Sequence, residues 1–161
     1  MTVHLDHIDR HILKTLQEDS RTTIKEMAAT LNLSTTPIFE RMKRLERNGV
    51  IQKQVALVNP EALNLDKLVF VSSSISEHRK EALDEFINQI VQFPEVLECH
   101  HVTGQSDFLL KVILKDLKSY NTFLLTKIST VSNIAKVESS FSLSTGKYTT
   151  ALPLVEEETR A

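Results

Sequence analysis

The chain has 161 residues, of which 41% are hydrophobic and 25% are charged, and its formal net charge is -2 at pH 7. This composition is typical of a globular protein and excludes a disordered chain, while the length allows one large domain or two small ones. The near-neutral charge gives no overall indication of nucleic-acid binding. Positive charge is local, because residues 35–54 carry five Lys and Arg against two Glu.

Cysteine content and the N-terminal residues indicate the compartment. Cys99 is the single cysteine, which excludes an intrachain disulfide and is typical of a reducing compartment. Asp6, Asp9 and Arg10 stand where a signal peptide would have an apolar core, and no apolar run approaches the length of a membrane span. We therefore expect a cytoplasmic protein without a membrane partner.

Residues 8–16 carry apolar side chains at the spacing of one helical face, which predicts the first helix of an N-terminal domain. His7 and His11 lie one helical turn apart within this segment. No nearby Cys or His completes a metal site, so we expect these side chains to be solvated. The sequence predicts no metal and no cofactor.

Residues 22–51 have the pattern of two short helices on either side of a tight polar turn. Thr23 followed three residues later by Glu26 is a capping box, which marks the start of the first helix. Asn32 tolerates the left-handed conformation that ends a helix, and the Ser34 hydroxyl can cap the next one. With the preceding helix, the pattern predicts a three-helix, winged-helix-like helix-turn-helix.

The second helix of this pair is predicted to read DNA. It buries Ile38, Met42 and Leu45, while Asn48 and Gly49 stop it. A major groove admits one such helix, whose short polar side chains and arginines can read base edges while other cations hold phosphates. The alternative is an ordinary helix pair with a solvated charged face. The predicted DNA-binding residues are Ser34, Thr35, Thr36, Pro37, Glu40, Arg41, Lys43, Arg44 and Arg47.

Residues 50–58 have the pattern of a β-strand, which Asn59 and Pro60 end. A three-helix unit has a thin core, so we expect this arm to pair with another segment, such as one of a second subunit. The predicted domains are a helix-turn-helix at 1–50, a β arm at 51–63 and a second domain at 64–161.

The second domain alternates strands with helices. Its order, β-α-β-β-α-β, predicts a ferredoxin-like sandwich with both helices on one face of an antiparallel sheet, and thus an α+β fold class. Leu109 and Ile113 place apolar groups on the other face, which predicts a homodimer. Residues 147–154 can add an edge strand, and residues 155–161 are expected to be frayed. The predicted strands are 68–75, 96–103, 107–114 and 137–145, and the predicted helices are 81–93 and 117–129.

The order of helix-turn-helix, extended arm and ferredoxin-like domain resembles the leucine-responsive and asparagine regulator (Lrp/AsnC) family almost end to end. Two positions depart from the family pattern, Asn64 and Ser132-Asn133, where glycine is more common, but Asn also adopts the left-handed turn. The matching residues are Leu5, Asp6, Asp9, Arg10, Leu16, Gln17, Asp19, Arg21, Leu33, Ser34, Pro37, Arg41, Arg44, Leu45, Glu46, Gly49, Asn59, Pro60, Pro94, Glu95, Val96, Glu98, Cys99, Gly104, Asp107 and residues 147–153.

This resemblance implies a transcription regulator whose homodimers often assemble into octamers, with an amino acid as the usual effector where ferredoxin-like domains of neighbouring dimers meet. Free amides around Gly104 could hold an α-carboxylate, and Asp107 could take an α-ammonium. The alternative is a plain hairpin in which Asp107 caps its own turn. The effector residues implied by position are His101, Val102, Thr103, Gly104, Gln105, Ser106 and Asp107.

Two other interpretations compete with this one. The sequence contains no glycine-rich phosphate loop, His-Glu-x-x-His helix or nucleophile elbow, so we expect no enzyme activity. An amino-acid-sensing interaction module without DNA binding remains the alternative, against which the basic helix argues. In a strand, Cys99 and His101 face one way and His100 the other, which favours a packing role over a metal site.

Overall fold

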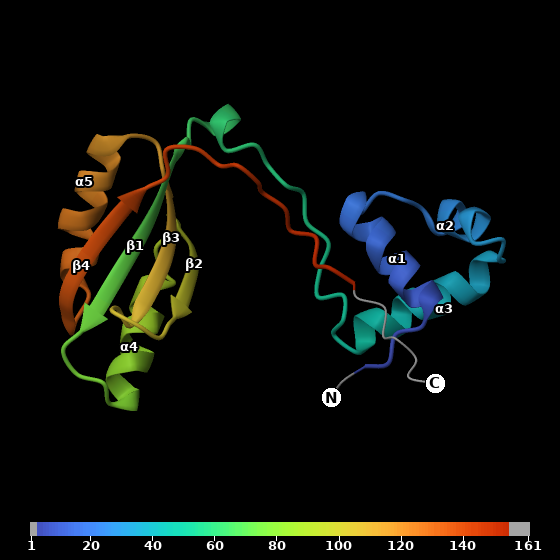
Figure 1. Ribbon diagram of the computed structural model, residues 1–161, viewed down its shortest axis with the longest axis horizontal. Helices are drawn as coiled ribbons and strands as arrows, with labels where there is room; N and C mark the ends of the chain where they lie inside the picture. Colours follow the sequence, from blue (N-terminus) through green and yellow to red (C-terminus); the bar gives the residue numbers. More distant parts are fainter. Residues whose placement is uncertain (1–2, 155–161) are drawn as a thin grey trace. The chain divides into compact units, whose positions relative to one another are not determined.

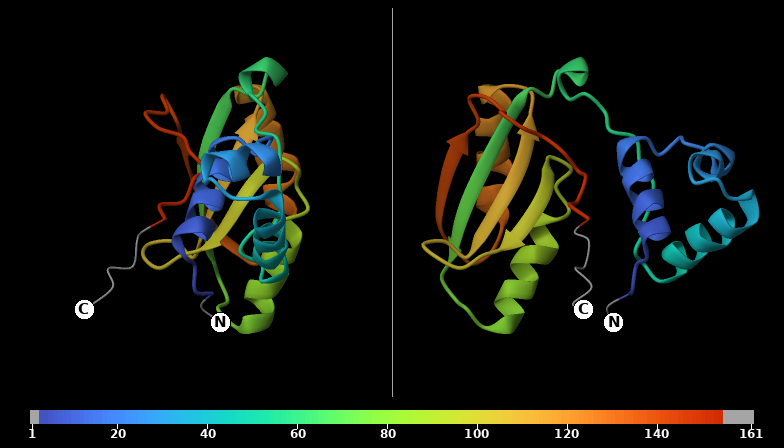
Figure 2. Two further views of the ribbon diagram at one scale, coloured as in Figure 1. Left: turned by 90° about the vertical axis from the view of Figure 1, so that its right-hand side faces the viewer. Right: turned by 45° about the vertical axis from the view of Figure 1, so that its right-hand side comes forward.

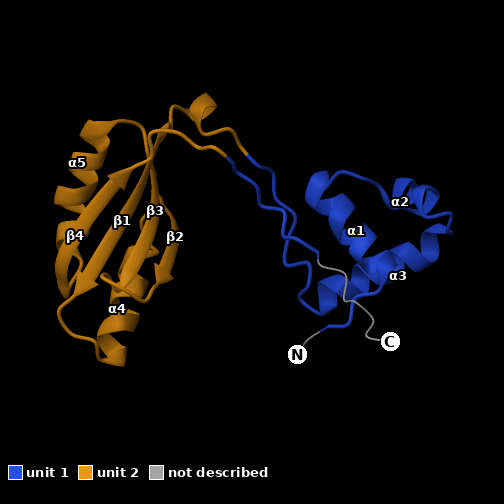
Figure 3. Cartoon of the chain, viewed as in Figure 1, with its two compact units in different colours: residues 1–57, 147–161 blue, residues 58–146 orange. Residues whose placement is uncertain are grey.

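The computed structural model describes residues 3–154, and the frayed segment expected at 155–161 lies outside them. The chain forms two compact units, one of residues 1–57 with 147–161 and one of residues 58–146 (Figure 3). We expected everything after residue 63 to belong to the second domain, whereas residues 147–154 group with the first unit by their contacts. Gln17 bonds to the backbone of Leu152, and Leu154 packs against the helical core.

The first unit contains three helices, α1 (His7–Glu18), α2 (Ile24–Thr30) and α3 (Thr35–Arg47) (Figure 1). Each helix contributes apolar side chains to one small core, as the helical spacing predicts. The buried residues of this core are Ile12, Leu13, Met27, Ala28, Ile38 and Leu45.

The starts of the helices are only partly as predicted. At α2, Thr23 Oγ1 accepts from the Glu26 amide at 3.2 Å while Glu26 Oε2 accepts from the Thr23 amide at 2.7 Å, which confirms the capping box. The Ser34 hydroxyl, in contrast, makes no capping hydrogen bond at α3. It stays exposed, so the first amides of α3 are left to solvent.

Helices α2 and α3 both end at a residue in the left-handed conformation. Asn32 has φ of 53° and Gly49 has φ of 70°. In each case the following amide reaches back to the last turn, from Leu33 to the Ala28 carbonyl and from Val50 to the Leu45 carbonyl, both at 2.9 Å. These Schellman motifs satisfy helix-end carbonyls and turn the chain sharply. The tight turn between α2 and α3 follows from the motif at Asn32.

The expected β arm does not form a strand within this chain. Residues 51–59 are extended without strand pairing, and Val55 and Leu57 are 58% and 64% exposed. Residues 147–154 likewise add no edge strand. An isolated strand lacks partners for its N–H and C=O groups, so an extended segment needs a neighbour before it becomes sheet.

The second unit has strands β1 (Lys67–Ile75), β2 (Val96–His101), β3 (Phe108–Leu114) and β4 (Ile134–Phe141), with helices α4 (Lys80–Ile90) and α5 (Leu117–Thr126). Short 3-10 turns lie at Glu61–Leu63 and Ile128–Thr130. The strands run antiparallel in the order β2-β3-β1-β4, which confirms the ferredoxin-like sandwich. Asn64 and Asn133 have φ of 57° and 66°, so asparagine does adopt the left-handed turns.

Both helices cover the same face of the sheet (Figure 2). Val71 of β1 and Leu110 of β3 alternate inward and pack with Phe86 of α4 and Phe123 of α5. On the opposite face Leu109 and Ile113 are half-buried, and Phe70 is 38% exposed. No helix among residues 3–154 combines the length and apolar character that a membrane span requires.

Candidate functional site

The exposed face of α3 carries most of the predicted DNA-binding side chains. Thr35, Thr36, Glu40, Lys43 and Arg47 are exposed on it, as the spacing predicts, while Ser34 is exposed at its start and Pro37 is half-buried in the first turn. Their availability follows from the burial of Ile38 and Leu45 on the other side of the helix. A short polar surface on one rigid helix therefore faces solvent.

Phe39 belongs to the same face but was not among the predicted residues. It is 44% exposed and lines a hollow of about 310 Å³ together with Ile24, Thr35 and Thr36. The Lys43 ammonium lies 5.9 Å from the centre of its ring. The sequence did contain a signal for Phe39, because the helical pattern places this aromatic residue at an exposed position.

Arg41 and Arg44 are bonded to carboxylates of the first unit. The Arg41 guanidinium donates to Asp6 at 2.6 Å and to Asp9 at 2.9 Å, and Arg44 donates to Asp9 at 2.5 Å. The Asp9 side chain is only 1% exposed. These arginines were expected on the flanks of the DNA-binding helix. In the structure their ion pairs with Asp6 and Asp9 join α3 to α1.

Asp6 is the second carboxylate of this ion cluster and also the N-cap of α1. Its side chain accepts from the Asp9 amide at 2.9 Å, and Asp9 in return accepts from the Asp6 amide at 3.2 Å. Burial alone would raise the pKa of Asp6, but these hydrogen bonds and the Arg41 guanidinium lower it from 3.8 to about 2. The carboxylate is therefore charged across the physiological range.

The predicted effector segment, His101 to Asp107, connects β2 to β3. Gly104 has φ of 127°, a conformation that favours glycine. The Val102 amide donates to the Asp107 carbonyl at 2.9 Å, which closes the hairpin, and the Asp107 amide donates to the Ser73 carbonyl of β1 at 3.0 Å. The amides of residues 103–106 form none of these backbone bonds.

The Asp107 carboxylate bridges to a neighbouring strand instead of capping its own turn. One oxygen accepts from the Ile75 amide at 2.9 Å, and the other lies 2.9 Å from His78 Nε2. The Ile75 hydrogen bond, with His78 as a further cause, holds the pKa of Asp107 below its ordinary value. His78 is a neighbour that sequence reasoning missed, because only the pairing of β1 with β3 brings the two side chains together.

Cys99, His100 and His101 alternate between the faces of β2 as predicted. His101 stacks on Phe108 with ring centres 5.1 Å apart, whereas His100 lies 3.1 Å from Glu98 on the other face. Cys99 packs against the core, and burial raises the pKa of its thiol. The thiol is therefore protonated at neutral pH and acts as a small apolar group.

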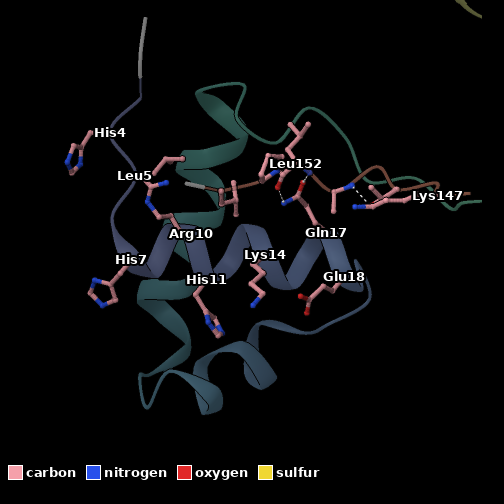
Figure 4. A pocket seen from close by; sticks show the side chains of 14 residues that line it. His4, Leu5, His7, Arg10, His11, Lys14, Gln17, Glu18, Lys147 and Leu152 are labelled. Atoms are coloured by element: carbon pink, nitrogen blue, oxygen red, sulfur yellow. Dashed lines mark hydrogen bonds between the residues drawn. The ribbon is translucent and has the colours of Figure 1, made fainter. Parts of the chain in front are cut away.

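A cavity of about 1290 Å³ lies between α1 and residues 147–154 (Figure 4). At one end the Gln17 side chain amide forms a pair of hydrogen bonds with the backbone of Leu152, donating at 3.3 Å and accepting at 2.7 Å. The α1 side of the cavity carries His7, His11 and Lys14. This double hydrogen bond imitates one rung of a β-ladder and holds the segment against the helix.

Comparison with protein families matches both units of the chain. Residues 5–52 match the winged helix-turn-helix DNA-binding family, and residues 68–152 match the Lrp/AsnC ligand binding domain. The first match covers α1, α2 and α3 with the capped turn between them. The second covers the sheet from Leu68 onward and the hairpin at Asp107.

Individual relatives agree with these family matches. The chain is 37% identical to the DNA-binding transcriptional activator DecR of Escherichia coli K12, over 93% of this chain and 99% of that protein. It is 40% identical to the leucine-responsive regulatory protein of the same strain, over 74% of this chain and 73% of that protein.

Solved structures give the same result. A transcriptional regulator of Neisseria meningitidis in complex with L-Met superposes with a TM-score of 0.88 at 35% identity, covering 93% of this chain and 97% of that one. E. coli AsnC superposes with a TM-score of 0.84 at 25% identity, covering 92% and 98%. These relatives are transcriptional regulators and not enzymes. With a DNA-binding helix-turn-helix and a ligand-binding sandwich in one chain, the protein belongs to the Lrp/AsnC family of transcriptional regulators.

Proposed function

We propose that this regulator contacts duplex DNA through the exposed face of α3. The observation that carries the proposal is that α3 has one buried and one exposed face. Ile38 and Leu45 pack in the core, whereas Thr35, Thr36 and Arg47 are exposed to solvent. Threonine hydroxyls can read base edges and Arg47 can hold a phosphate. Arg41 and Arg44 contribute by fixing the helix through Asp9.

The hairpin at 101–107 is the proposed site of an amino-acid effector. The amides around Gly104 suit an α-carboxylate, and the Asp107 oxygen next to His78 suits an α-ammonium. The related Neisseria regulator in complex with L-Met supports an amino acid as the ligand class. On this proposal the α-ammonium replaces His78 as the partner of Asp107, and His101 faces the ligand's side chain.

The active form is proposed to be a homodimer that assembles further, as an octamer or another assembly of dimers, in the cytoplasm. Phe70, Leu109 and Ile113 lie around Lys111 on the sheet face away from the helices and are only partly buried. The exposed arm residues Val55 and Leu57 add a second apolar surface. Covering these groups with a second copy removes apolar area from water and gives the extended arm a strand to pair with.

The DNA proposal is tested by titrating duplex affinity against salt for the wild type, Arg47→Ala and Arg44→Ala. Removing one phosphate contact lowers the magnitude of the slope of log K against log salt by about 0.9. We expect this loss for Arg47→Ala. Arg44→Ala should instead lower the melting temperature with the slope retained, because its guanidinium is bonded to Asp9. No duplex binding by the wild type would contradict the proposal.

The effector proposal is tested by melting the protein with each of the twenty amino acids. A ligand that prefers the folded assembly raises the melting temperature by mass action. Asp107→Asn keeps an acceptor for the Ile75 amide but removes the charge, so it should abolish the shift. Glu138→Gln, on exposed β4, is the matched control and should keep the shift. A shift that survives in Asp107→Asn would exclude the hairpin as the site.

A further inference from the structure

The exposed face of α3 is less basic than its sequence suggests. Arg41 and Arg44 are bonded to Asp6 and Asp9. Lys43 forms an ion pair with Glu46 at 2.8 Å. Once these pairs are taken into account, the exposed face offers one other cation, Arg47, and one other anion, Glu40.

Glu40 stands at the centre of this face without a cation. It lies one helical turn after Thr36 and one turn before Lys43, so the three side chains share one exposed stripe. Within residues 3–154 no ion pair involves Glu40, because Lys43 bonds to Glu46 on its other side. The carboxylate is therefore available to whatever this face of α3 meets.

A free carboxylate at a DNA interface has a specific physical consequence. Phosphates repel it, so it weakens binding to DNA of every sequence. It can only accept hydrogen bonds, and in the major groove the amino groups of cytosine and adenine are the donors. Adenine N7 is an acceptor beside its amino group and opposes the second carboxylate oxygen, whereas cytosine carries no acceptor there. Cytosine is the base that a carboxylate accommodates best.

We infer that Glu40 is a specificity-determining residue that accepts a hydrogen bond from the N4 amino group of a cytosine in each DNA half-site. The inference rests on the proposed DNA-binding role of α3. Glu40 lowers affinity for DNA that lacks the cytosine. Where the cytosine is present, the hydrogen bond from its N4 amino group offsets this loss of affinity. Thymine at the same position presents an acceptor, O4, and is rejected.

The experiment first selects preferred duplexes from a random-sequence pool with the wild-type protein. Dissociation constants are then measured for the selected duplex and for a mixed-sequence duplex with the wild type, Glu40→Gln and Glu40→Ala. Glu46→Gln is the matched control, since it removes one negative charge from the same helix. Glu40 has no partner to lose, so a melting curve should show each Glu40 variant as stable as the wild type.

We expect Glu40→Ala to bind the mixed duplex several-fold more tightly and to lose about tenfold in the ratio of selected to mixed affinity. Replacing the critical cytosine by thymine should lower the affinity of the wild type for the selected duplex by about tenfold and should change the affinity of Glu40→Ala little. Glu46→Gln should keep the ratio. An unchanged ratio in Glu40→Ala, with selective wild-type binding, overturns the role of Glu40 only. Absence of wild-type duplex binding overturns the DNA-binding proposal as well.

Discussion

The carboxylate of Asp9 accepts a hydrogen bond from the guanidinium of Arg41 at 2.9 Å, across the interface between α1 and α3. Arg44, one turn along α3, donates to the other oxygen of the same carboxylate. Asp9 is almost completely buried, and its amide donates to the side chain of Asp6, the N-cap of α1. One acidic residue therefore links the start of the first helix to the helix proposed to enter DNA.

Substitution of Asp9 by Ala should lower the unfolding free energy of the first unit by about 3 kcal/mol, because it leaves two arginine charges without their buried partner. Asp19→Ala is the control, since Asp19 pairs with Arg21 at an exposed site where solvent screens the pair and the loss should be much smaller. Denaturant titration followed by far-UV circular dichroism measures both. Equal losses in the two variants would contradict a buried structural role for Asp9.

Acid should weaken the same cluster over a defined pH range. The pKa of Asp6 falls from 3.8 to about 2 on folding, so its contribution to stability is present above pH 3.8 and is lost as pH falls towards 2. The difference in unfolding free energy between the wild type and Asp6→Asn should therefore be constant above about pH 5 and shrink below pH 3.8. A difference that stays constant down to pH 2 would show that the Asp6 pKa is not lowered.

The paired hydrogen bonds between Gln17 and Leu152 predict local protection of the C-terminal segment. In Gln17→Ala the Leu152 amide loses its acceptor and should exchange with deuterium at least several-fold faster. Lys14 lines the same cavity from the same helix, so Lys14→Ala is the matched control and should leave the exchange rate unchanged. Equal rates in the wild type and Gln17→Ala would show that the segment is not held at this point.

Ser73 predicts a substitution that does not destabilise the sheet. Its hydroxyl is buried in β1, and within residues 3–154 it has no hydrogen-bond partner. Ser73→Ala should leave the unfolding free energy of the second unit unchanged or raise it by up to about 1 kcal/mol, since the desolvated hydroxyl disappears. Leu110→Ala, in the same core, should lower it by about 2 to 5 kcal/mol. A loss above about 1 kcal/mol in Ser73→Ala would show that the hydroxyl forms a stabilising bond.

Local chemistry explains which parts of the fold could be predicted from the sequence. The Thr23 capping box and the left-handed turn at Asn32 depend on residues within one helical turn, and both are present. The alternation of Leu110 with Leu109 likewise gave the two faces of β3. The overall order of elements follows from such short-range patterns, and the family match confirms it.

Contacts between distant segments could not be predicted in the same way. Arg41 reaches Asp9 across 32 positions of sequence, and Leu152 meets Gln17 across 135. A helical wheel places Arg41 on a flank of α3, but only the packing of α1 against α3 shows that the Asp9 carboxylate lies next to it. Asp107 and His78 meet for a similar reason, since the pairing of β1 with β3 brings their loops together.

The most direct test of the account combines DNA selection with the amino-acid panel. Duplexes selected from a random pool should share dyad-symmetric half-sites, because a symmetric dimer presents two copies of α3. The amino acid that raises the melting temperature should change affinity for the selected duplex by about fivefold or more, which is the usual range of coupling between two sites. A pool without enrichment, or a duplex affinity that every amino acid leaves unchanged, would contradict an amino-acid-responsive DNA-binding regulator.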